Sequence, residues 1–212
     1  MAIPLALDTD AIIWSAPERE RADRPLIVLL HGYGSHEGDL FGMSPGLPLG
    51  PVVASLRAPI AESGGYAWWS LAGSRSGSPD PAAVDAGAAA VIAWLDTLPS
   101  TSVSLLGFSQ GAALALQLNR HAPGRFAATV ALSGFVAPGE HAGDAELERL
   151  RPPVFWGRGT DDAVIPAAAV DRTAEWLPAH ADATIRIYEG LAHSISSAEL
   201  GDFTAFLREH AA

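Results

Sequence analysis

A serine flanked by glycines lies where the chain is expected to pass from a strand into a helix. Ser109 is the centre of the motif Gly107-Phe108-Ser109-Gln110-Gly111. The apolar segment 102–106 predicts a buried strand before it, and the alanine-rich segment 112–119 predicts a helix after it. Such a turn exposes the serine hydroxyl at the positive end of the helix. Ser109 is therefore predicted to be a catalytic nucleophile, with the backbone N–H of Gln110 directed at a developing oxyanion.

The same Gly-x-Ser-x-Gly pattern occurs a second time, in Gly42-Met43-Ser44-Pro45-Gly46. No strand-like run precedes this copy, and the proline-containing segment 47–51 cannot continue as a helix. Pro45 also has no N–H to offer to an oxyanion. We therefore predict that Ser44 is a loop residue.

A serine hydroxyl needs a base to take its proton, and histidine is the usual base. In enzymes built around such a turn, the chain order is serine, then acid, then histidine. Three histidines lie late enough in the chain, namely His180, His193 and His210. The first is expected at a helix end and the last near the terminus, whereas His193 directly follows the last predicted strand. We predict that His193 is the base.

Two adjacent aspartates, Asp161 and Asp162, are candidates for the acid that orients the histidine. Both follow a predicted strand, but adjacent carboxylates cannot both point at one imidazole. The segment 162–166, Asp-Ala-Val-Ile-Pro, gives Asp162 a fixed place before the next helix. We therefore favour Asp162 as the acid and expect Asp161 to act in a turn or as a helix cap.

An oxyanion hole needs a second N–H besides that of Gln110. The segment His31-Gly32-Tyr33-Gly34 follows the first strongly apolar run, where enzymes of this architecture place that loop. The N–H of Tyr33 is the natural donor, while the side chains of His31 and Tyr33 are expected to pack. For the substrate pocket we predict four lining side chains: Trp68, Trp69, Phe135 and Val164. For the two tryptophans, packing in the core is an equally open alternative.

Alternation of apolar runs and helical spacing extends over most of the chain. Strands are predicted at 25–30, 52–56, 103–106, 126–132, 153–156 and 184–188, with an early edge strand at 12–14. Helices are predicted at 82–98, 112–119, 167–177 and 197–210. This order predicts an α/β fold with a mostly parallel sheet covered on both faces, which binds ligands beyond the carboxyl ends of its strands. The irregular segment 59–81 is long enough to wall a pocket, and no linker divides residues 1–212, so a single domain is expected.

Composition excludes several classes of function. The 212 residues are 49% hydrophobic and 17% charged, which indicates a globular protein. The absence of cysteine and lysine excludes thiolate nucleophiles, disulfides and lysine Schiff bases. A net charge of −11 argues against binding nucleic acid or anionic membranes. The seven histidines form no metal-ligand motif along the sequence, so we expect no metal and no cofactor in catalysis.

The N-terminus has no basic segment before its apolar residues, and no apolar run approaches the ~20 residues that span a bilayer. A cytoplasmic location without stable membrane association is the expectation.

Four motifs together resemble the phospholipase/carboxylesterase group of small α/β-hydrolases, which includes acyl-protein thioesterases. They are Leu30–Gly34, Gly107–Gly111, Gly159–Pro166 and Gly190–His193, in the order of that family. The glutamine after the serine is typical of the group, and the family pattern places the acid on Asp162. The resemblance implies hydrolysis of an ester or thioester through an acyl-enzyme, by Ser109, His193 and Asp162. At 212 residues with short connections, little room is expected for a separate lid domain.

The leading hypothesis is a serine carboxylesterase that hydrolyses short- to medium-chain esters. An acyl-protein thioesterase or lysophospholipase with longer acyl substrates is the first alternative. A non-catalytic binding protein that keeps the hydrolase fold is an alternative of another class, and peptidase or haloperoxidase chemistry also stays open because fold does not fix the leaving group. The expected partner is a small-molecule ester, bound by a monomer or homodimer.

Overall fold

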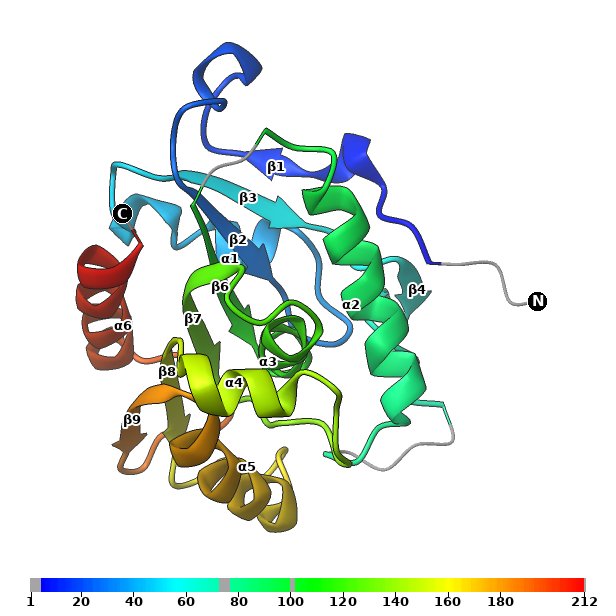
Figure 1. The fold of residues 1–212 in the computed structure, drawn as a ribbon, viewed down its shortest axis with the longest axis vertical. Helices are drawn as coiled ribbons and strands as arrows, with labels where there is room; N and C mark the ends of the chain where they lie inside the picture. The colour runs from blue at the N-terminus through cyan, green and yellow to red at the C-terminus, as the bar shows by residue number, and fades with distance from the viewer. Residues whose placement is uncertain (1–4, 73–76, 100–101, 212) are drawn as a thin grey trace.

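A seven-stranded sheet forms the centre of the computed structural model, which describes residues 5–72, 77–99 and 102–211. Its strands lie in the order β1-β3-β2-β6-β7-β8-β9 (Figure 1). They are β1 (Ile13–Trp14), β2 (Leu26–Leu30), β3 (Val52–Leu56), β6 (Val103–Phe108), β7 (Phe126–Leu132), β8 (Pro153–Gly159) and β9 (Asp182–Tyr188). Neighbouring strands are parallel except for β1, which pairs antiparallel with β3 at the edge. The predicted edge strand and the predicted mostly parallel sheet are confirmed.

The continuous apolar run of β2 is explained by burial on both faces. Successive side chains of a strand point to opposite faces, and every residue of β2 is buried. Val28 and Leu30 pack in the core beneath α2 and α3, whereas Ile27 and Leu29 pack in a second core beneath α6. A sheet covered on both sides needs apolar residues at every position, which is the pattern of parallel α/β sheets.

Helices form a layer on each side of the sheet (Figure 1). One face carries α2 (Pro81–Leu95), α3 (Gln110–His121), α4 (Asp144–Leu150) and α5 (Ala167–His180). The other carries α1 (Gly38–Phe41) and α6 (Ser197–His210). None of the helices in the described part of the chain is long and apolar enough to cross a membrane.

The structure corrects several predicted elements. Part of the segment predicted as irregular forms a hairpin of β4 (Ile60–Glu62) and β5 (Gly65–Ala67), while residues 73–76 of it lie outside the described residues. The short helices α1 and α4 and this hairpin were not predicted, since each is too short to show a period. Helix α5 continues past its predicted end at residue 177 to His180, with Pro178 inside its last turn.

Candidate active site

Three side chains meet beyond the carboxyl ends of the central strands. Ser109 follows β6, Asp162 lies in the loop after β8, and His193 lies in the loop after β9. The distance from Ser109 Oγ to His193 Nε2 is 2.9 Å, and His193 Nδ1 is 2.8 Å from Asp162 Oδ2. The structure thus brings together the residues predicted as nucleophile, base and acid, in one continuous chain of hydrogen bonds.

Ser109 stands on a strained turn. Its φ of 55° and ψ of −115° are unusual for a residue with a side chain, and it is the N-cap residue of α3. A Cβ at Gly107 would lie 2.3 Å from the carbonyl oxygen of Gly111, and one at Gly111 would lie 1.9 Å from that of Leu30. Both positions therefore need glycine, because backbone packs directly against backbone there. The turn presents Ser109 rigidly above the sheet.

Asp162 is enclosed and fully hydrogen-bonded. Its side chain is 1% exposed, and its Oδ1 accepts the backbone N–H groups of Val164 at 2.9 Å and Ile165 at 3.2 Å. Burial alone would raise the pKa of this carboxyl, but the hydrogen bonds from His193 and the two N–H groups outweigh burial and lower it. Asp162 is therefore an anion that can orient an imidazole and stabilise its charged form.

The neighbouring Asp161 lies apart from the imidazole. It is exposed, its N–H donates to the carbonyl of Leu191, and its carboxylate accepts the Thr160 hydroxyl. It is thus a turn residue, as predicted. A Cβ at Gly159 would lie 1.7 Å from that same carbonyl of Leu191, so glycine is what lets the His193 loop approach β8.

The loop that carries Tyr33 is held by its neighbours. His31 donates from Nδ1 to the Gly32 carbonyl at 2.7 Å and accepts the Ala58 N–H on Nε2 at 3.1 Å. Burial, the largest cause, lowers the pKa of His31 and keeps it neutral. The Tyr33 hydroxyl donates to Glu62 at 2.9 Å. Both side chains thus hold the loop in place through hydrogen bonds.

The side chain of Gln110 has a role that the sequence did not reveal. It is buried, its Oε1 accepts the backbone N–H of Trp68 at 2.9 Å, and its Nε2 donates to the backbone carbonyl of Trp69 at 2.8 Å. Gln110 thus fastens the segment after β5 to the serine turn. A buried polar residue inside an apolar segment is the sequence feature that could have indicated this role.

Comparison with known proteins agrees with this geometry. A family model described as Phospholipase/Carboxylesterase matches residues 13–211. The chain belongs to this family. Its mostly parallel sheet with helices on both faces is thus that of an α/β-hydrolase, as the resemblance implied.

Individual relatives of this phospholipase/carboxylesterase chain carry hydrolase names. Acyl-protein thioesterase 1 of Saccharomyces cerevisiae is 33% identical over 107 residues, which are 49% of this chain and 47% of that protein. The match thus spans about half the length of that curated relative. The crystal structure of esterase PE8 is 27% identical, with a TM-score of 0.73, and covers 98% of this chain and 100% of its own. A Bacillus cereus carboxylesterase is 19% identical, with a TM-score of 0.78 and 93% coverage of each chain, and it shares the fold.

A cavity of about 320 Å³ opens beside Ser109. It is lined by Tyr33, Gln110, His193 and three of the predicted pocket residues, Trp69, Phe135 and Val164. Lining residues that were not predicted include Asp39, Leu71, Pro79, Phe108 and Ile165. The ring of Phe108 lies 4.9 Å from that of His193, so the residue before the serine also positions the imidazole.

The prediction for Trp68 as a substrate-binding residue is wrong. Trp68 is fully buried in the core between α2 and α3, and its indole N–H donates to the His31 carbonyl at 2.8 Å. The adjacent Trp69 belongs to the same buried core but also lines the cavity. The second Gly-x-Ser-x-Gly motif forms a single 3-10 turn at Ser44–Gly46, away from the cavity-lining residues.

Proposed function

We propose that this protein is a serine carboxylesterase that hydrolyses short- to medium-chain esters through an acyl-enzyme. The observation that carries the proposal is the hydrogen-bonded chain from Ser109 Oγ through His193 to the enclosed carboxylate of Asp162. A serine aligned with an imidazole, which is itself held by a carboxylate, is the arrangement for nucleophilic attack on a carbonyl.

In the first half of the reaction, Ser109 Oγ attacks the ester carbonyl carbon while His193 Nε2 takes the hydroxyl proton. The carbonyl oxygen becomes an oxyanion, which accepts the backbone N–H groups of Tyr33 and Gln110. The intermediate collapses, the C–O bond to the alcohol breaks, and His193 returns the proton to the leaving alkoxide. Asp162 stabilises the imidazolium throughout.

In the second half, His193 takes a proton from water, and the hydroxide attacks the acyl carbon bound to Ser109. Collapse of this second intermediate releases the carboxylic acid and returns the proton to Ser109 Oγ. No redox step occurs, and every proton passes through His193. The reaction therefore needs no cofactor.

The cavity supports small acyl substrates. Its volume of about 320 Å³ is near the lower end of the range for small-molecule sites. Trp69, Phe135 and Ile165 supply apolar walls, whereas Asp39 brings a carboxylate to the lining. A carboxylate at the cavity disfavours an anionic group on the substrate, so neutral esters fit better than phospholipids with anionic head groups.

The similarity to acyl-protein thioesterase 1 of yeast favours one second candidate, thioester hydrolysis with longer acyl chains. The same residues can perform it, because a thiolate leaves more easily than an alkoxide. A groove that extends beyond the cavity on substrate binding would be required.

The test is hydrolysis of p-nitrophenyl esters from acetate to palmitate, with an acyl thioester series in parallel. We expect kcat/KM to peak at short chains in the native protein and to fall to background in Ser109→Ala. Ser44→Ala, which alters the second Gly-x-Ser-x-Gly motif, is the matched control and should keep full activity. A peak at long thioesters would favour the thioesterase candidate instead.

Absence of turnover on any ester or thioester would contradict the hydrolase proposal and support the non-catalytic alternative. Equal turnover in Ser109→Ala would show that another group is the nucleophile.

A further inference from the structure

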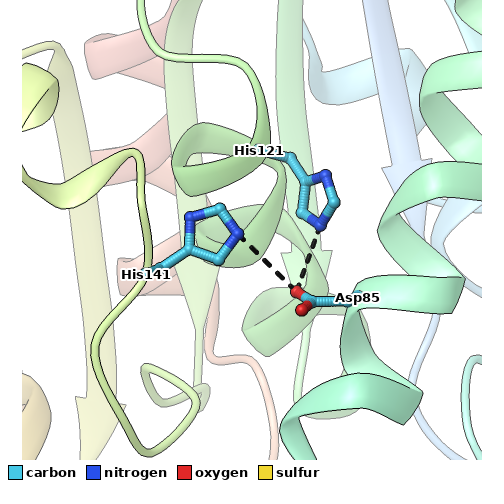
Figure 2. Close-up of side chains that lie close together, drawn as sticks. All are labelled: Asp85, His121 and His141. Carbon is cyan, nitrogen blue, oxygen red and sulfur yellow. Dashed lines mark hydrogen bonds and ion pairs between the residues drawn. The ribbon is translucent and has the colours of Figure 1, made fainter.

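A second group of histidines and a carboxylate lies at the opposite end of α3 from Ser109. Asp85, His121 and His141 point toward one another (Figure 2). Asp85 Oδ1 is 3.1 Å from His121 Nε2 and 3.8 Å from His141 Nε2. One ligand atom from each residue lies within 4.8 Å of the others. Three metal-ligating side chains thus converge on one point.

The three residues come from three separate elements. Asp85 lies on α2, His121 is the last residue of α3, and His141 lies in the loop before α4. They are 36 and 20 positions apart in sequence, so no spacing pattern joins them. For this reason the sequence showed no cluster, and the fold alone assembles it.

Buried polar groups hold the cluster in place. Gln117, which is 2% exposed, donates to Asp85 Oδ1 at 2.6 Å. Arg120 is also 2% exposed and binds the carbonyls of Ala137 and Gly139 at 3.2 and 2.7 Å. These bonds fix the start of the loop that carries His141. Groups that orient the ligands of a metal in this way contribute to its affinity.

We propose that Asp85, His121 and His141 form a binding site for a divalent transition-metal cation, with Zn²⁺ as the best match. Two imidazole nitrogens and one carboxylate oxygen are a donor set of zinc sites that keep a position open for water. Ligand atoms of a tetrahedral site with bonds near 2.0–2.1 Å lie roughly 3.3 Å apart. The distances from Asp85 Oδ1, 3.1 and 3.8 Å, are close to that value, and a bound cation would draw the two imidazoles closer together.

Binding requires a proton to move on both imidazoles. His121 Nε2 lies 3.1 Å from Asp85 Oδ1, which can only accept, so this nitrogen carries the ring proton before a cation binds. The same holds for His141. The Gly143 N–H donates to His141 Nδ1 at 3.1 Å, so the proton of the neutral ring is on Nε2, facing Asp85. A cation binds Nε2 of the other neutral tautomer, so this proton must move, by exchange with solvent, from Nε2 to Nδ1. The hydrogen bond from Gly143 must then break. The Gly143 amide is therefore a reporter for the site.

The expected consequence of binding is stability. A cation on these ligands cross-links α2, the end of α3 and the loop before α4. Helix α3 spans eleven residue steps from Gln110 to His121, which is about 17 Å along its axis. The metal is too far from Ser109 to take part in the chemistry, so turnover should not depend on it.

The test is titration of the chelator-treated, full chain with Zn²⁺ by calorimetry, with thermal unfolding measured in parallel. We expect one high-affinity Zn²⁺ per chain and a higher melting temperature. Asp85→Asn, His121→Asn and His141→Asn should each weaken binding more than about 100-fold, and Gln117→Ala about 10-fold, since it only orients a ligand.

Two controls locate the ion. His180→Asn removes a histidine that lies 3.6 Å from Glu148 but belongs to no group of three possible ligands among the described residues, and it should keep full affinity. His193→Asn removes the active-site imidazole and should also bind one Zn²⁺. In an NMR titration, the Gly143 amide should shift in the native chain and not in His121→Asn.

The proposal is overturned if the native chain binds no Zn²⁺. It is equally overturned if Asp85→Asn and His121→Asn, folded by circular dichroism, both retain the affinity of the native chain. Loss of binding in His193→Asn with retention in His121→Asn would assign the ion to the active site.

Discussion

The two ends of α3 carry the same chemical groups, imidazole and carboxylate, in different surroundings. At the N-terminal end, the Asp162 side chain is 1% exposed and both its oxygens accept hydrogen bonds. At the C-terminal end, the Asp85 side chain is 39% exposed and faces two imidazoles. Enclosure and a single imidazole suit the movement of one proton at a fixed place. Partial exposure and converging metal-ligating side chains suit a cation.

The largest difference between the two ends should appear in turnover. His193→Ala removes the base at one end of α3, and His121→Ala removes an imidazole at the other. We expect kcat/KM for p-nitrophenyl acetate to fall by at least about 10⁴-fold in the first variant, and to stay unchanged in the second. A comparable loss of kcat/KM in His121→Ala would show that the two ends of α3 are coupled, and would contradict the proposal that the histidine cluster takes no part in turnover.

Variants of the two adjacent aspartates, Asp161 and Asp162, test which of them is the acid. Asp162→Asn keeps the shape but cannot stabilise an imidazolium, so kcat should fall by roughly 10³–10⁴-fold. Asp161→Asn changes an exposed turn residue and should alter kcat less than about 3-fold. Steady-state kinetics on one ester measures both. Similar losses in the two variants would contradict the assignment of Asp162 as the acid.

Glu199 is a buried carboxyl group that the proposed reaction does not use. Glu199 on α6 is fully buried against β8, and neither of its side-chain oxygens has a hydrogen-bond partner among the described residues. Burial, the largest cause, raises the pKa of Glu199 to about 7. The backbone N–H of Ser196 opposes the rise, and the charge of Asp202 adds to it. The folded protein therefore holds a proton that the unfolded chain releases near pH 4.5.

This proton makes stability depend on pH. The stabilising effect is complete below pH 4.5 and is lost as the pH rises through about 7, by up to about 3 kcal/mol. Glu199→Gln cannot ionise. The free energy of unfolding of this variant, relative to that of the native chain, should therefore increase as the pH rises from 5 to about 8. Glu209→Gln, on the same helix but 76% exposed, is the control. Parallel pH profiles for the native chain and Glu199→Gln would refute this assignment.

The smallest expected effect concerns the cavity. The Val164 side chain lines the cavity next to Asp162, and the residue is 51% exposed. Val164→Ala should raise KM for butyrate esters by roughly 2–5-fold at nearly constant kcat, because part of one apolar wall is lost. Leu49→Ala removes an apolar side chain that is 89% exposed and does not line the cavity, and should leave KM unchanged. Equal KM values for both variants would exclude Val164 from the substrate site.

The two ends of α3 also differ in what the sequence could predict. At the N-terminal end, each residue stands directly after a strand in a short motif, and parallel strands bring their carboxyl ends together. The position of Ser109, Asp162 and His193 near one another was therefore predictable. The cluster of Asp85, His121 and His141 was not, because their proximity depends on how helix α2 packs against α3.

Local burial was the other limit of prediction. Trp68 and Trp69 are adjacent, identical in type and both buried in one core, and only the fold decides that Trp69 also lines the cavity. The two hydrogen bonds of the Gln110 side chain join it to backbone groups more than 40 positions away in the sequence. Strands β2 and β7 were predictable to within one residue, because burial on both faces produces an apolar run, unbroken in β2 and interrupted only by Thr129 in β7.

Covalent labelling is the most direct test of Ser109 as the nucleophile of a serine hydrolase. The native protein is treated with a fluorophosphonate, digested, and mapped by mass spectrometry. We expect one adduct per chain, on Ser109 within the peptide that contains Gly107–Gly111, and no adduct in His193→Ala over the same time. An adduct on Ser44, or none on any serine of the folded protein, would contradict it.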